Sequence, residues 1–244
     1  MPSRTASCFF SLILIISIVT STPGQEAVRV TGSVSDPLSN PIPGADISLF
    51  SLDRILQTTS DSSGHFTFDV VPTGKYEFEV LAQGFKRFTN PNVSVTDSMH
   101  KAKQGQLELT ARMEIAPTGS PIVMAATDVA SPGSCGQPES VTYGPRKRSG
   151  GDTLAGTVIN LYPKMPVAGA TLQLLDAAGA QIAQQQTNER GEFRFKEVAP
   201  GRYHIAFQHP GYNNTKSYEF WVARENATYI TMQAVQLGKF VVCQ

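Results

Sequence analysis

The chain is built from short segments in which apolar and polar residues alternate with a period of two. Ala45, Ile47 and Leu49 alternate with polar neighbours, and Phe66 and Phe68 follow the same rule. Such alternation is typical of β-strands that bury one face. After the first two dozen residues, no window of about 11 residues or more shows a convincing helical period. The pattern predicts an all-β fold made of several short strands.

Turns rich in Gly, Asp, Asn, Ser and Pro separate these segments, as expected between strands. Further strands are predicted at Glu26 to Val34, Tyr76 to Val80, Leu107 to Met113, Ala170 to Leu175, Phe193 to Phe195, Tyr203 to Phe207, Tyr218 to Val222 and Ala227 to Val235. About seven strands in each half predict two packed sheets per half, which is a β-sandwich.

The two halves carry the same pattern of glycines, turn residues and aromatics. The first copy contains Gly32, Pro41-Ile42-Pro43-Gly44-Ala45, Asp61, Gly64, Phe66, Phe68, Pro72, Gly74, Tyr76, Gly84 and Phe85. The second contains Gly156, Gly169-Ala170, Gly191, Phe193, Phe195, Pro200-Gly201, Tyr203, Gly211 and Tyr212. We interpret the repeated glycines as turn residues and the repeated aromatics as core. No repeated residue has the character of a catalytic group.

This repeated pattern resembles the carboxypeptidase regulatory-like domain. The resemblance implies two tandem seven-stranded Greek-key β-sandwiches of the transthyretin-like type. The second copy departs from the pattern at Asn188, which replaces the turn Asp, and at Pro166, which is shifted by one place. Modules of this family accompany peptidases, outer-membrane receptors and surface proteins, so the resemblance implies no reaction.

Domain boundaries follow from the repeat. We expect one sandwich at residues 25–116 and a second at 152–244. Residues 117–151 between them are rich in Pro, Gly and Ser and contain the basic trio Arg146-Lys147-Arg148, which indicates a linker.

Residues 1–24 have the order of a secretory signal peptide. Arg4 precedes an apolar run from Phe9 to Thr20, and small residues follow it, with cleavage expected between Ser21 and Gly24. A spanning helix needs about 20 apolar residues, so a retained anchor is the alternative and not the first choice. The mature protein is therefore expected to be secreted or periplasmic, without stable insertion in a membrane.

The charge of the chain offers no electrostatic reason for binding nucleic acid. Twenty basic and twenty acidic residues cancel, and charged residues make up 16% of the chain. A nucleic-acid-binding surface normally carries an excess of Lys and Arg, so we expect no such partner.

Two cysteines remain after removal of Cys8 with the signal. Cys135 precedes the second copy and Cys243 follows it. In an oxidising compartment this arrangement favours a Cys135–Cys243 disulfide that ties the ends of the second domain together. Two free thiols are the alternative.

The histidines are the obvious candidates for catalysis or metal binding. A faint resemblance to intradiol dioxygenases around Tyr203 and His204 lacks one ligand, because Ala206 stands where a second histidine is required. His65, His100 and His209 complete no ligand set either. We therefore expect no catalytic residue, metal or cofactor, with an enzymatic role at His204 as the least favoured reading.

The remaining candidates for ligand binding are Phe85 and Tyr212, which occupy the same position of the two copies. As loop aromatics they could stack on sugars, although the same position also suits a plug at the end of each core. We expect a non-catalytic protein for cell-envelope adhesion, scaffolding or partner binding. The partner would be an envelope protein or a polysaccharide, and carbohydrate binding through Phe85 and Tyr212 is the alternative.

Overall fold

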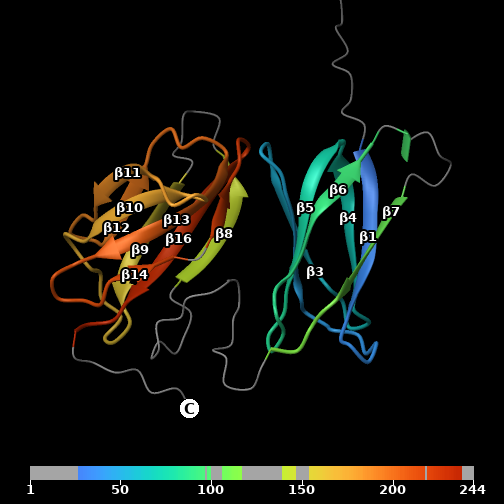
Figure 1. Ribbon diagram of the computed structural model, residues 1–244, viewed down its shortest axis with the longest axis horizontal. Helices are drawn as coiled ribbons and strands as arrows, with labels where there is room; N and C mark the ends of the chain where they lie inside the picture. The colour runs from blue at the N-terminus through green and yellow to red at the C-terminus, as the bar shows by residue number, and fades with distance from the viewer. Residues whose placement is uncertain are drawn as a thin grey trace, which may run out of the picture.

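A computed structural model describes residues 27–96, 98–99, 106–116, 139–146, 154–217 and 219–237. These residues form two β-sandwiches that lie next to each other along the longest axis of the molecule (Figure 1). Across these ranges, no helix combines the length and the apolar character needed to cross a membrane.

The first sandwich contains seven strands. They are β1 (Ala27–Ser35), β2 (Asp46–Phe50), β3 (Ile55–Thr59), β4 (His65–Pro72), β5 (Gly74–Leu81), β6 (Phe88–Val95) and β7 (Gln106–Arg112). One sheet has the order β4-β1-β7 and the other the order β3-β2-β5-β6. β1 and β7 are parallel, whereas the other paired strands run antiparallel.

The second sandwich repeats this arrangement. Its strands are β8 (Glu139–Pro145), β9 (Leu154–Asn160), β10 (Thr171–Asp176), β11 (Gln181–Gln186), β12 (Glu192–Phe195), β13 (Gly201–Gln208), β14 (Thr215–Lys216), β15 (Phe220–Val222) and β16 (Asn226–Ala234). One sheet has the order β12-β9-β16-β8, and the other has the order β11-β10-β13-β14, with β15 also paired to β13.

The predicted pair of seven-stranded sandwiches is confirmed, with two differences in the second copy. The strand equivalent to β6 is divided into β14 and β15, which pair with the two ends of β13. In addition, β8 forms within the segment expected to be a linker and pairs antiparallel with β16. This segment gave no strong alternation, because Gly and Pro interrupt it.

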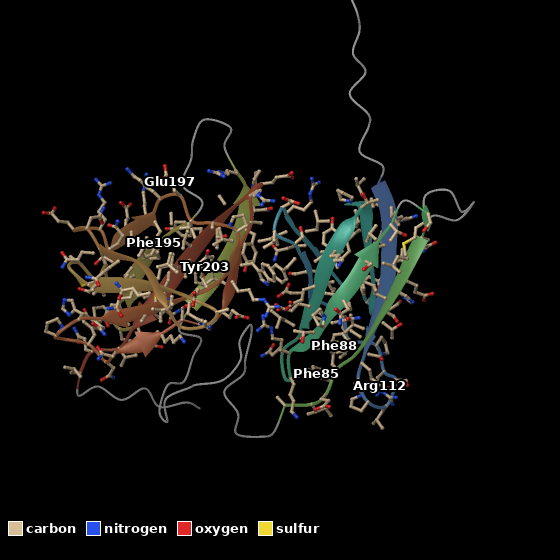
Figure 2. All side chains as sticks on the ribbon, turned by 45° about the horizontal axis from the view of Figure 1, so that its top comes forward. Phe85, Phe88, Arg112, Phe195, Glu197 and Tyr203 are labelled. Carbon is tan, nitrogen blue, oxygen red and sulfur yellow. The ribbon has the colours of Figure 1, made fainter. Side chains whose placement is uncertain are left out.

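The repeated aromatics form the two cores, as the alternation predicted. Phe66 stacks on Phe78 with ring centroids 5.7 Å apart, and Phe88 meets the edge of Phe78 at 5.9 Å. In the second sandwich Phe193 and Phe195 are in edge contact at 5.8 Å. Figure 2 labels Phe88 in the first sandwich and Phe195 in the second. Burial of these rings is the main source of stability of each domain.

Buried polar groups are repeated together with the aromatics. The hydroxyl of Tyr76 donates to the carbonyl oxygen of Pro72 at 2.9 Å, and the hydroxyl of Tyr203 donates to that of Ala199 at the same distance. Each repeated tyrosine thus fixes the chain that leads into its own strand, in addition to filling the core. This explains why tyrosine and not phenylalanine recurs at this position.

Two of the repeated glycines lie in the middle of strands and not in or beside turns, contrary to our interpretation. Gly32 and Gly156 lie within β1 and β9. A Cβ atom on Gly32 would lie 2.0 Å from the carbonyl oxygen of Leu109 and 2.5 Å from the ring of Phe66. Gly156 has the same surroundings in the second copy. These glycines are required because a phenylalanine ring, repeated in both copies, and the backbone of the neighbouring strand leave no room for a side chain.

We expect Gly32→Ala and Gly156→Ala each to lower the free energy of unfolding by about 3 kcal/mol, because the methyl group would overlap backbone and ring atoms. Chemical denaturation of the purified protein measures this change. Gly144→Ala is the matched control, since a Cβ at this strand glycine has no neighbour within 4 Å. Equal stability of all three variants would contradict the close-packing argument.

Candidate functional site: the interface between the sandwiches

The outer face of the sheet β3-β2-β5-β6 is buried at its two central strands, β2 and β5, although alternation along a strand indicates a solvent-exposed outer face. In β5 the core residues Tyr76, Phe78 and Val80 alternate with Glu77 and Glu79, and all five are buried. Buried carboxylates on the outward face require a covering surface, because their desolvation is costly in an unpaired state. The second sandwich supplies part of this cover.

An aromatic cluster lies at the centre of the contact. Phe50 of the first sandwich stacks on Trp221 of the second, with ring centroids 5.5 Å apart and planes inclined by 8°. Tyr143 meets the edge of Phe50 at 5.7 Å. Ile55 and Ala223 complete this buried cluster. Its residues come from β2, β3, β8 and β15 and the turn after β15, so it joins the two domains through apolar burial.

Charged groups surround the aromatic cluster. The guanidinium of Arg202 lies 5.0 Å from the centroid of the Trp221 ring. Arg202 also pairs with Glu77 of the first sandwich and, at 3.3 Å, with Glu219 of the second. Arg202 thus contacts the indole face of Trp221 and two carboxylates at the same time. These contacts fix the position of Trp221 against the neighbouring domain.

Glu79 is the most enclosed carboxylate near the interface. The Nε of Arg87 donates to it at 2.8 Å, and only 5% of the Glu79 side chain is exposed. Burial raises the pKa of Glu79 above its ordinary value of 4.5, and Glu219 adds to the rise, whereas the charge and the hydrogen bond of Arg87 oppose it. The ionised form of Glu79 is thus destabilised in the folded protein.

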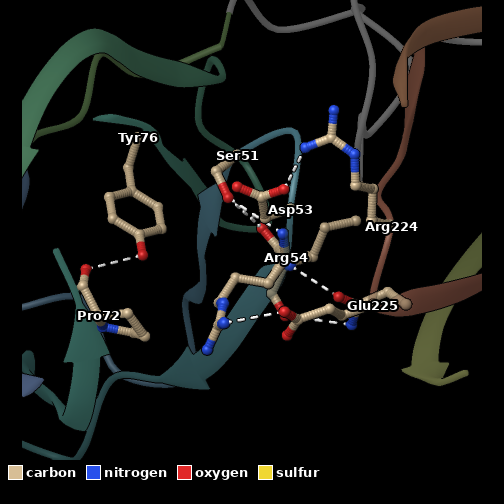
Figure 3. Close-up of polar contacts among 9 residues, drawn as sticks. Ser51, Asp53, Arg54, Pro72, Tyr76, Arg224 and Glu225 are labelled. Carbon is tan, nitrogen blue, oxygen red and sulfur yellow. Dashed lines mark hydrogen bonds and ion pairs between the residues drawn. The ribbon is translucent and has the colours of Figure 1, made fainter. Parts of the chain in front are cut away.

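The turn between β2 and β3 joins the turn between β15 and β16 (Figure 3). Backbone N–H groups of Arg224 and Glu225 donate to the carbonyl oxygens of Leu52 and Asp53 at 3.1 and 2.8 Å. Arg54 and Glu225 form an ion pair at 3.0 Å, and Arg224 pairs with Asp53.

Asn226 completes this connection by pairing with the edge of β3. The N–H of Ile55 donates to Oδ1 of Asn226 at 2.9 Å, and Nδ2 of Asn226 donates to the carbonyl oxygen of Ile55 at 3.3 Å. The side-chain amide therefore takes the place of a neighbouring strand for one residue. It also satisfies backbone groups that an edge strand leaves open.

The interface residues occupy positions at which the two copies differ. Matched strand pairs show this: Lys75 lies opposite Ser94 in the first copy, and Arg202 lies opposite Trp221 in the second. In the same way, Phe50 lies opposite Glu77 in the first copy, and Leu175 lies opposite His204 at the corresponding positions of the second. The core is repeated and the contact surface is not, so the two domains fit each other in one orientation.

The structure places the predicted ligand-binding residues at the ends of the cores. Phe85 is partly buried against the first core, where Figure 2 labels it, and Tyr212 is partly buried against the second. Tyr212 meets Phe207 edge-on at 6.2 Å and His209 at 5.0 Å. Both aromatics contribute to core packing, and their binding of sugar stays a prediction. Cys135 and Cys243 lie outside the described residues.

The described histidines His65, His204 and His209 make no contact with one another. Nδ1 of His204 lies 3.1 Å from the carbonyl oxygen of Ser217, and Nδ1 of His209 accepts the N–H of Gly211 at 3.0 Å. His65 is exposed at the start of β4, and His100 lies outside the described residues. In the part of the chain that the structure describes, no group of three or more His, Cys, Asp or Glu side chains could hold a metal ion.

Comparison with family models identifies both domains. The model of the carboxypeptidase regulatory-like domain matches residues 29–110 and 153–235. These ranges fall within the two sandwiches, with β8 outside them, and make up more than half of the chain. The protein therefore belongs to the carboxypeptidase regulatory-like domain family, with two tandem copies. No curated protein sequence matches the chain.

Distant likenesses occur among solved structures. The Bacillus anthracis TIE protein is 14% identical with a TM-score of 0.30, over 86% of this chain and 34% of that protein. The shaft pilin SpaA from Lactobacillus rhamnosus GG is 9% identical with a TM-score of 0.29, over 88% and 100%. The minor pilin GBS52 of Streptococcus agalactiae is 12% identical with a TM-score of 0.28, over 89% and 99%. Similarity at this level carries no functional conclusion.

We expect Phe50→Ala to separate the two sandwiches while leaving each one folded, because it removes the ring on which Trp221 stacks. Trp221 is the only tryptophan of the chain, so its fluorescence reports directly on the contact. Its emission should shift to longer wavelength, and thermal unfolding should begin at lower temperature, since a Phe→Ala change at a buried site costs about 3 kcal/mol.

Tyr229→Ala is the control for this variant. Tyr229 is 44% exposed on β16 and belongs to neither core nor interface cluster. Its replacement should leave the emission of Trp221 unchanged. An unchanged emission in Phe50→Ala would show that the stack does not exist in solution.

Mild acid should stabilise the protein through Glu79. Because the pKa of Glu79 is higher in the folded than in the unfolded state, the folded protein binds this proton more readily. The destabilisation by its buried charge is therefore lost as pH falls through the folded-state pKa towards 4.5. Between neutral pH and the ordinary value, wild type should gain stability relative to Glu79→Gln, which does not titrate.

Denaturant titrations at several pH values measure this difference. Glu114→Gln is the comparison, since the hydrogen bond and charge of Lys86 lower the pKa of the exposed Glu114 below 4.5. Its difference from wild type should stay constant over the same pH range. A constant difference for Glu79→Gln as well would disprove the linkage.

Proposed function

We propose that this protein is a non-catalytic, extracytoplasmic unit of the cell envelope that acts in adhesion, scaffolding or partner binding. The observation that carries the proposal is the interface, which joins two modules of a family without a reaction of its own into one body. In this view, the residues that distinguish the copies serve to fix the relative orientation of the two surfaces. The signal-like residues 1–24 support export.

A rigid pair of domains suits adhesion and scaffolding for a physical reason. Binding through two surfaces held in a fixed orientation avoids the entropy that a flexible linker loses on binding. The long segment between the domains would permit many orientations, whereas the contacts of Phe50, Trp221 and Asn226 select one. Disruption of the interface should therefore weaken attachment to an extended partner, whereas the fold of each domain should stay nearly unchanged.

We expect the full-length chain, expressed in a bacterium with a general secretion pathway, to appear in the periplasm or medium. Mass spectrometry should place its new N-terminus after Ser21 to Gly24. Intact protein that is retained in the cytoplasm would contradict export. A chain held in the membrane with residues 1–24 attached would favour the retained anchor.

The role itself is tested by binding of the purified mature protein to two envelope preparations. One has been stripped of other proteins, and in the other the polysaccharides have been digested. Wild type should bind, and Phe50→Ala should bind several-fold more weakly because its domains are no longer held together. Tyr212→Ala and Phe85→Ala, checked for folding, should bind as wild type.

The alternative of carbohydrate binding predicts the opposite pattern. A glycan-array signal that is lost in folded Tyr212→Ala or Phe85→Ala and retained in Phe50→Ala would replace the proposed role. Absence of binding to every envelope preparation would refute the proposed role, and absence of a glycan-array signal would refute the alternative.

A further inference from the structure

The outer edge of β7 has no partner strand among the described residues. β7 is the last strand of the sheet β4-β1-β7 and forms the margin of the first sandwich away from the second (Figure 1). An edge strand presents unpaired N–H and C=O groups to any extended segment that can align with it.

The second sandwich shows what this position of the fold accepts. β16 corresponds to β7, since Ile230 pairs with Gly156 as Leu109 pairs with Gly32. The outer edge of β16 is covered by β8, which runs antiparallel to it and places Val141 opposite Ile230. The edge of the first sandwich is thus equivalent to one that is filled by an antiparallel strand in the same chain.

The unfilled edge leaves apolar surface uncovered. Ile230 is fully buried in the second sandwich, where Val141 of β8 packs against the core. Its counterpart Leu109, and Leu107 two residues earlier on β7, are only partly buried against the first core, whereas Ala111 and its counterpart Met232 are both buried. An added strand on β7 would cover these two leucines as β8 covers its neighbours.

Side chains cap two other strand edges, those of β3 and β15, and among the described residues no side chain caps the backbone of β7 in this way. Asn226 pairs with both backbone groups of Ile55 at the edge of β3. At β15, the N–H of Trp221 donates to the hydroxyl of Tyr143 at 3.2 Å, and its carbonyl oxygen accepts the hydroxyl of Thr228 at 2.9 Å.

The sequence of β7 is complementary to itself in the antiparallel direction. Glu108, Thr110 and Arg112 are exposed and lie on one face, whereas Leu107, Leu109 and Ala111 lie on the other. A two-fold axis through Thr110 places Glu108 opposite Arg112 of the second copy and Leu109 opposite its Ala111. Opposite charges then meet at both ends of the pairing, and apolar residues meet on the core face.

We propose that two copies of this protein pair through β7 as antiparallel neighbours, which joins their sheets into one six-stranded sheet, β4-β1-β7 of one copy continuing into β7-β1-β4 of the other. Facing Cβ atoms of an antiparallel pair are about 5 Å apart, so the Glu108 and Arg112 side chains can reach each other. The pairing is isologous and closes at a dimer. This dimer is an inference beyond the proposed function. Its failure would leave the proposed function intact, because attachment to the envelope is measured in a separate experiment.

The test is sedimentation analysis of the mature full chain over a wide range of concentration. Wild type should form a dimer. Glu108→Arg and Arg112→Glu should each dissociate about tenfold more readily, since each places like charges opposite each other twice in the pair. An equimolar mixture of the two variants should restore pairing as a heterodimer, and the double variant Glu108→Arg/Arg112→Glu should restore the homodimer.

Asp69→Arg is the matched control, because it changes an exposed charge on β4, at the opposite edge of the same sheet. It should pair as wild type, and thermal unfolding checks that every variant is folded. A wild-type monomer at all concentrations would overturn the proposal. So would a dimer unaffected by both charge substitutions, which would use another edge such as β11.

Discussion

The stack of Phe50 on Trp221 is the contact on which the joint structure of the two sandwiches depends. It buries apolar surface, whereas the ion pairs around it must first lose their hydration and so contribute little net free energy. The polar contacts act on orientation instead. Arg202 and Asn226 accept only one placement of the neighbouring domain, because their partners are fixed groups on β5 and β3.

Much of the fold could be predicted from the sequence, because the core follows local rules. Alternation at Ile47 and Leu49 gave a strand, and the repeated aromatics gave both cores. The interpretation of Gly32 and Gly156 as turn residues was wrong. Each of these glycines makes room for a phenylalanine ring on a paired strand that is distant in the sequence. β8 was missed because its pairing with β16 depends on tertiary contacts and not on a local pattern.

The interface was harder to predict than the core. Glu77 and Glu79 alternate with core residues, which is also the pattern of a solvent-exposed face. Trp221 lies in a segment that was predicted to be a strand, but its neighbour across the domain boundary could not be predicted from one strand. A position-by-position comparison of the two copies could have indicated the interface. Trp221 occupies the position of Ser94 in the first copy, and two copies with the same surroundings would not need different residues there.

The parallel pairing of β1 with β7 and of β9 with β16 governs the order in which the chain can fold. β1 meets β7 only after residue 106 has been made, and β9 must wait for β16. β16 also carries β8, so a whole four-stranded sheet is completed by the final segment of the described chain. Contacts of such high sequence separation form slowly. Neither sandwich can therefore close before its last strand, β7 or β16, is available to pair.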